Sequence, residues 1–204
     1  MSETQSPVSK HRLEALSDGI YAIALTLLVL ELKVPALPHP TTESQLAEAI
    51  LAVGPKALTW ALSFWIIGLF WLGQLRLLAL AKSLNTGLTF IELVHLSLIT
   101  LFPFTTAFLG EFLSHTVAAA LYAGHLVLIA VVSWWRITYF VTHPELHGPD
   151  VSPTVVTALR RRGLLLTGCA FATFGLAFVF PPWNTLAMLP TLLLFRPPRP
   201  GMSA

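Results

Sequence analysis

Charged side chains are scarce in this chain. Of its 204 residues only 11% are Asp, Glu, Lys or Arg, whereas 55% are hydrophobic. A soluble globular domain carries about 25% charged residues, because its surface must be polar. The composition therefore excludes a soluble protein. Since helices satisfy their own backbone in lipid, we expect an all-α integral membrane protein, with residues 1–204 forming a single transmembrane domain.

Several other features are missing as well. The chain has one cysteine, Cys169, so no internal disulfide can form. Its net charge of +2 is too small for a nucleic-acid surface. No P-loop glycine pattern, HExxH or GxSxG motif occurs, which argues against ATP-driven transport and common hydrolytic chemistry. We expect no enzyme activity, no cofactor and no nucleic-acid partner.

Two further absences narrow the classes of membrane protein. No TVGYG loop is present, so a filter of carbonyl rings is excluded. No helix carries Arg at every third position, which excludes a typical voltage sensor. The loop with His143, Glu145, His147 and Asp150 matches no metal-ligand spacing, so we interpret it as a solvated loop and predict no metal site.

Long apolar stretches are abundant, and six are bounded by Pro, Gly or charge. They predict transmembrane helices near residues 13–34, 54–75, 88–110, 118–140, 163–181 and 183–196. The last is short for an untilted crossing and contains Pro190, so a re-entrant segment is the alternative. Ala36–Glu48 and Thr142–Pro153 are predicted loops, and the first of them is expected to enter the second helix from a surface-lying start near Gln45.

The basic residues set the expected orientation. With the N-terminus inside and six crossings, most of them fall on the cytoplasmic side: Lys10, Arg12, Arg76, Lys82, Arg136, Arg160, Arg161, Arg162, Arg196 and Arg199. Only Lys33 and Lys56 fall outside. Cytoplasmic loops carry the excess of Lys and Arg, so we expect a multi-pass cell-membrane protein with both termini cytoplasmic.

The first helix combines an apolar stripe with polar ends. Ile23, Leu27 and Leu30 recur at i, i+4 and i+7. Ser17 and Asp18 precede the stripe, Thr26 interrupts the apolar run and Glu31 follows it. Apolar constrictions gate by dewetting and acidic groups concentrate cations, so the pattern suits a cation pore. Packing or lipid contact remains the alternative.

Polar residues also gather at the inner ends of the first three helices. Asp18 needs a structural partner, and Arg12 is the nearest candidate in the chain. Gln74, Arg76, Glu92 and His95 fall at a similar depth. A buried polar cluster that joins the helices is the preferred interpretation, and a proton relay is the alternative.

The first helix resembles a known family. Arg12, Leu16-Ser17-Asp18-Gly19, the run Ile20 to Leu28 and Leu30-Glu31-Leu32-Lys33-Val34-Pro35 are similar to the signature of the transmembrane protein 175 family of lysosomal and bacterial potassium channels. Phe64-Trp65, Phe70-Trp71 and Leu101-Phe102-Pro103-Phe104 strengthen the resemblance. Leu16 stands where the family usually has Phe. Gln74 stands where many members have His, and Gln cannot titrate.

The resemblance implies a homotetramer of single six-helix chains with a central pore lined by the first helix. Ile23 would form the main constriction, with Leu27 and Leu30 as further layers, and Thr26 would add a hydroxyl ring or pack behind the pore. Arg12, Ser17, Asp18 and Gln74 would form the structural polar network. The permeant ion would be potassium; the alternative is a proton-coupled secondary transporter that titrates Asp18, Glu92 and His95.

Overall fold

The computed structural model describes residues 9–37 and 39–195 as a bundle of long helices. In chain order the elements are α1 (Lys10–Leu27), η1 (Leu28–Glu31), α2 (Glu43–Leu80), α3 (Thr86–Glu111), α4 (Thr116–Thr142), η2 (Pro144–Leu146), α5 (Pro153–Leu176) and η3 (Pro181–Phe195). Within the described residues, four helical segments are long and apolar enough to cross a membrane: Lys10–Glu31, Glu43–Leu80, Thr86–Glu111 and Thr116–Thr142.

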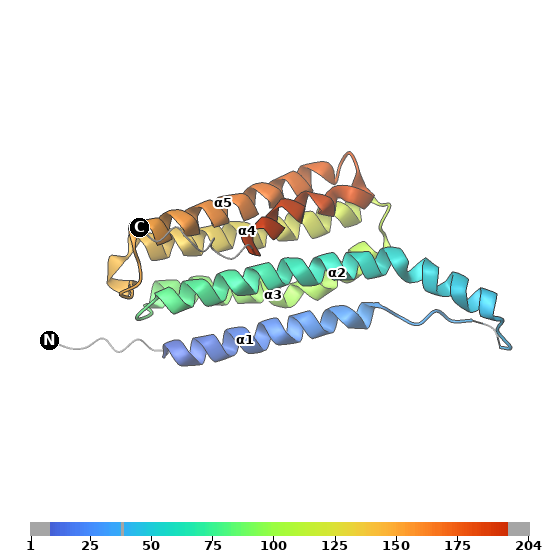
Figure 1. Cartoon of the computed structure of the whole chain (residues 1–204), viewed down its shortest axis with the longest axis horizontal. Coiled ribbons are helices and arrows are strands. Elements are labelled where there is room, and N and C mark those ends of the chain that lie inside the picture. Colours follow the sequence, from blue (N-terminus) through green and yellow to red (C-terminus); the bar gives the residue numbers. More distant parts are fainter. Residues whose placement is uncertain (1–8, 38, 196–204) are drawn as a thin grey trace, which may run out of the picture.

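The helices lie lengthwise beside one another and alternate in direction (Figure 1). The blue α1 lies at one edge of the bundle and packs on α2 and α3, while α4, α5 and η3 form the opposite side. Two contacts tie one end together: Lys10 Nζ donates to the Ala81 carbonyl over 2.7 Å, and the Gly148 amide donates to the Leu80 carbonyl over 2.8 Å. That end therefore holds the start of α1, the α2–α3 turn and the α4–α5 link.

Aromatic and aliphatic side chains fill the interior in two clusters. The larger one centres on Tyr21, Phe70, Phe102 and Tyr122, all at most 2% exposed. The rings of Phe102 and Tyr122 pack at a tilt of 56° with their centroids 5.5 Å apart, and the Tyr122 hydroxyl is hydrogen-bonded to that of Ser63. The smaller cluster, around Leu13 and Phe140, seals the end at which α1 begins. Together they hold one face of α1 against the bundle.

The predicted loop Ala36–Glu48 is too long, because α2 already begins at Glu43. Thr42 caps this helix: its hydroxyl accepts from the Gln45 amide, and the Gln45 side chain accepts from the Thr42 amide. This reciprocal pair is a capping box. The 38 residues of α2 span about 57 Å, well beyond a hydrocarbon core of about 30 Å, and its first turns project past the bundle in Figure 1.

The fifth predicted span also differs from the structure. Helix α5 begins at Pro153, ten residues before the predicted 163, and Ser152 caps it by accepting from the Val155 amide over 3.3 Å. The predicted span began after Arg160–Arg162 because charged residues interrupt an apolar stretch, although the backbone is helical at these residues. The predicted loop Thr142–Pro153 agrees with the gap between α4 and α5, apart from the single 3₁₀ turn of η2.

The last apolar stretch forms the 3₁₀ helix η3 and runs back along α5 (Figure 1). A 3₁₀ helix advances about 2.0 Å per residue instead of 1.5 Å, so its 15 residues reach about 30 Å. This length is compatible with a crossing, and the re-entrant segment stays the alternative. Arg196 and Arg199, which we assigned to the cytoplasmic side, lie outside the described residues.

Candidate functional site

Helix α1 has one buried face and one exposed face. Leu13, Ser17, Tyr21, Ala24 and Leu28 are at most 3% exposed and pack on the bundle. The stripe predicted from the sequence lies on the other side, with Ile23 60%, Leu27 41% and Leu30 65% exposed. Because no other described element covers these side chains, they are available to lipid or to another copy of the chain.

Thr26 lies on the exposed side of α1 beside this stripe. Its hydroxyl donates within its own helix, to the carbonyls of Ala22 and Ile23 over 3.0 and 2.9 Å. A threonine hydroxyl satisfied in this way tolerates apolar surroundings. Its two predicted roles, adding a hydroxyl ring or packing behind the pore, stay predictions, because both concern a pore formed by several copies of the chain.

The predicted polar network of Arg12, Ser17, Asp18 and Gln74 divides in the structure. Ser17, Asp18 and Gln74 line a common cleft of about 490 Å³ between α1 and α2. Asp18 accepts a hydrogen bond from Trp71 Nε1 over 3.0 Å, so its partner is Trp71 and not Arg12. Arg12 is exposed and, across the described residues, forms no ion pair.

Gln74 belongs to a second polar cluster, which is almost fully buried between α2, α3 and α4. The Gln74 amide donates to Glu92 Oε2 over 2.8 Å, and its carbonyl accepts from Arg136. Arg136 Nη1 also lies 3.1 Å from Glu92 Oε2, with both side chains at most 3% exposed. Ser133 Oγ is 2.9 Å from His95 Nε2. We call these five residues the buried cluster.

Sequence reasoning placed three of these five residues together and missed the other two. Gln74, Arg76, Glu92 and His95 were expected at one depth. The structure supplies Arg136 instead, together with Ser133, both from α4. Arg136 looked like one of the basic residues that flank cytoplasmic loops. Its place six residues before the end of α4 was the available signal, since a charge that far inside an apolar helix needs a partner.

At the opposite end of the bundle, Lys56 Nζ lies 2.6 Å from Glu111 Oε2. Glu31, which follows the apolar stripe, lines a small pocket with these two residues. Within residues 9–37 and 39–195, no three His, Cys, Asp or Glu side chains lie close enough to hold a metal ion. In the predicted metal-free loop, His147 Nε2 lies 2.9 Å from the Phe140 carbonyl.

The arrangement therefore consists of an apolar exposed stripe on α1, a polar cleft at one end of this helix and an acidic residue at the other. An apolar stripe between polar ends is suited to controlling the passage of water and ions.

Comparison with known proteins gives consistent results. The sequence model of a family described as the endosomal/lysosomal potassium channel TMEM175 matches residues 12–103. A protein of Streptomyces collinus named a potassium channel is 35% identical over 86% of each chain. A potassium channel of Chamaesiphon minutus is 33% identical over 88% of this chain and 89% of its own.

A solved structure is similar as well. The crystal structure of a lysosomal potassium-selective channel TMEM175 homologue from Chamaesiphon minutus superposes with a TM-score of 0.76 at 30% identity, and the match covers 90% of this chain and 95% of that one. A shorter match, 39% identical over 74 residues, links this chain to the human endosomal/lysosomal proton channel TMEM175. It spans 34% of this chain and 15% of the human protein.

Proposed function

We propose a function on the basis that this chain belongs to the TMEM175 family of ion channels, which confirms the resemblance noted in its first helix. It is a membrane protein and not an enzyme. In our proposal four copies form a potassium-permeable cation channel whose pore follows the fourfold axis. The first helix of each copy lines this pore with Ile23, Leu27 and Leu30, and Thr26 adds a hydroxyl beside them.

The exposed stripe of α1 is the observation that carries this proposal. Helix α1 lies at the edge of the bundle with one face packed and the other exposed. The exposed face can therefore pack against α1 of other copies around a symmetry axis without displacing any other element. Four copies of Ile23 would then form an apolar ring. Such a ring blocks ions when dry and conducts them when wet, so small movements of α1 would open and close the pore.

The proposed topology has six crossings, formed by α1, α2, α3, α4, α5 and η3, in the cell membrane. Alternating helix directions support it, because they gather basic residues at the end where α1 begins: Lys10, Arg12, Arg76, Lys82, Arg136 and Arg160–Arg162. Lys56 lies at the other end with Glu111. By the positive-inside rule, the former end is cytoplasmic, and so are both termini.

Potassium is the proposed permeant ion because the two bacterial relatives that match most of the chain are named potassium channels. An apolar constriction without a carbonyl filter discriminates weakly between ions of one charge. We therefore expect modest preference for potassium over sodium. No energy source other than the ion gradient is required.

The direct test is reconstitution into liposomes that hold a potassium gradient, with valinomycin as the positive control. The Ile23→Asn variant should raise potassium leak and admit more sodium, because a polar ring is easier to wet. Val29→Asn is the matched control: Val29 is also exposed, at 48%, but lies off the stripe, and its substitution should leave selectivity unchanged. Unaltered flux in the Ile23 variant would contradict the proposed pore.

Proton-coupled transport is the second candidate, because animal relatives are named proton channels and the buried cluster contains the titratable pair Glu92 and His95. It predicts saturable flux driven by a pH gradient, without potassium conductance. In the structure both side chains are engaged with neighbours inside the bundle, away from the α1 stripe. This location favours a structural role for the cluster and the channel as the function.

A further inference from the structure

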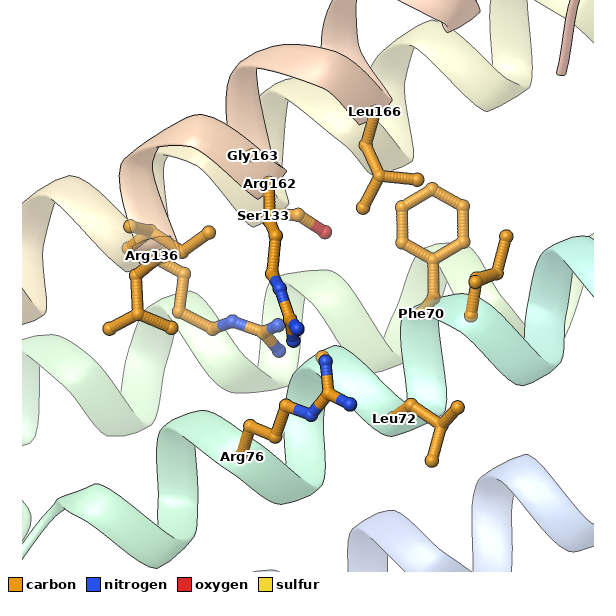
Figure 2. A pocket seen from close by; sticks show the side chains of 12 residues that line it. Phe70, Leu72, Arg76, Ser133, Arg136, Arg162, Gly163 and Leu166 are labelled. Carbon is orange, nitrogen blue, oxygen red and sulfur yellow. The ribbon is translucent and has the colours of Figure 1, made fainter. Parts of the chain in front are cut away.

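Three arginines from three different helices meet in one pocket at the end of the bundle where α1 begins. Arg76 comes from α2, Arg136 from α4 and Arg162 from α5. Figure 2 shows their side chains pointing toward one another into this pocket. Its volume is about 50 Å³, several times the 10–15 Å³ that a single water needs, so it can hold a group of several atoms.

The charge of this pocket is only partly balanced. Arg136 is paired with Glu92, but its Nε has no hydrogen-bond partner among the described residues although the side chain is almost fully buried. Within the same part of the chain, Arg76 and Arg162 form no ion pair. No Asp or Glu lines the pocket. Arg136 is buried, Arg162 is partly buried and Arg76 is exposed. Like charges that converge on one pocket repel one another, and an anion bound between them reduces this repulsion.

We propose that this pocket binds the phosphate of an anionic phospholipid of the cytoplasmic leaflet. Guanidinium groups match phosphate oxygens with paired N–H donors, and three of them around one pocket supply the donors that a phosphodiester needs. A neutral ligand would add no charge balance at the partly buried Arg162, whereas an anion does.

The position of the pocket favours a lipid over a free phosphate ion. Arg76 lies about one turn from the end of α2, and long basic side chains near the ends of membrane-spanning helices reach the headgroup region. The other lining residues are mostly apolar and include Leu69, Phe70 and Leu166. An acyl chain can pack against this apolar surface next to the bound headgroup, whereas inorganic phosphate has no apolar part that would contact it.

This site is independent of the α1 stripe, so it can be tested whatever the channel conducts. The experiment is native mass spectrometry of the purified protein after exchange into mixed phosphatidylglycerol and phosphatidylcholine. The wild type should retain phosphatidylglycerol selectively. Arg162→Gln and Arg76→Gln should each lower this retention about tenfold, as expected for the loss of a charge-assisted hydrogen bond to the phosphate.

Arg161→Gln is the matched control, because it removes the same charge from the same helix while Arg161 is exposed and outside the pocket. It should change retention less than twofold, which is within the spread of nonspecific charge effects. The elution volume on gel filtration checks that each variant is folded. Because the two pocket variants lie on different helices, the test remains possible if one of them does not fold.

Three results would overturn the proposal. Retention in the Arg161 variant could fall as far as in the Arg162 variant, which would indicate general attraction to a basic surface. Both pocket variants could retain as much phosphatidylglycerol as the wild type, which would show that the pocket does not bind this lipid. Inorganic phosphate added to the wild type in the mixed lipids could displace the retained phosphatidylglycerol in full, which would assign the pocket to free phosphate.

Discussion

Two ion pairs on α3 show how strongly the surroundings of a residue decide its energetic role. Glu92 and Arg136 pair inside the bundle with side chains at most 3% exposed. Glu111 and Lys56 pair at the helix end with side chains 63% and 40% exposed. Exposed pairs contribute little because water screens them. A buried pair is different, since removing one partner leaves an uncompensated charge in a medium that solvates it poorly.

Glu92→Gln should therefore destabilise the protein substantially. The amide keeps the shape and some hydrogen bonds of the carboxylate but leaves the charge of Arg136 unbalanced, at a cost of about 3 kcal/mol. In a chain of this size we expect the midpoint of thermal unfolding in detergent to fall by about 5–10 °C.

Glu111→Gln makes the same chemical change on the same helix and is its control. We expect little or no change in its unfolding midpoint, because Glu111 is exposed at the end of α3. Equal midpoints for the two variants would contradict the structural role assigned to the buried cluster.

At the scale of the helices, hydropathy located the elements but not their ends. The four most apolar spans agree with helices because lipid-length apolar runs have few other solutions. The start of α2 was expected near Gln45 and lies at Glu43, where Thr42 and Gln45 form a capping box. The early start of α5 was missed, since a hydropathy window measures apolar length and not helix length. Ser152 before Pro153 was visible in the sequence and would have given this start.

Glycine at position 163 sets how closely α4 and α5 approach. A Cβ built there would lie 2.7 Å from Trp134 Cε3 and 3.0 Å from Ile137 Cδ1. Gly163→Ala should therefore force the helices apart and destabilise the protein by about 1–3 kcal/mol, despite the better helix propensity of alanine.

Gly168→Ala on the same helix is the comparison, because a Cβ there meets no atom within 4 Å. It should leave stability unchanged or raise it by up to about 1 kcal/mol, since alanine is the better helix former. Thermal unfolding of both variants in one detergent measures the difference. A Gly163 variant as stable as the Gly168 variant would show that the two helices are not in close contact.

At the scale of the whole molecule, the sequence predicted depth better than it predicted lateral neighbours. Gln74, Glu92 and His95 were expected at one level in the membrane, which is where the buried cluster lies. Apolar patterns carry no information about which of several helices faces a given side chain. Arg136 could therefore not be assigned to this cluster from the sequence, nor Trp71 to Asp18.

Assembly is a property of the whole molecule that the exposed α1 stripe leads us to expect. The purified protein in mild detergent should have a protein mass about four times that of the 22.3 kDa chain. Light scattering coupled to gel filtration measures this mass independently of the bound detergent. A monomer or dimer that still conducts potassium would contradict a pore on a fourfold axis.

The central claim is that the α1 stripe faces an ion pathway, and cysteine accessibility tests it most directly. Since Cys169 is the only native cysteine and is buried, Cys169→Ala provides the background. We predict that a cationic thiol reagent blocks the potassium current of Ile23→Cys, Leu27→Cys and Leu30→Cys but spares Val29→Cys. Block that is absent from all four, or equal in all four, would contradict the claim.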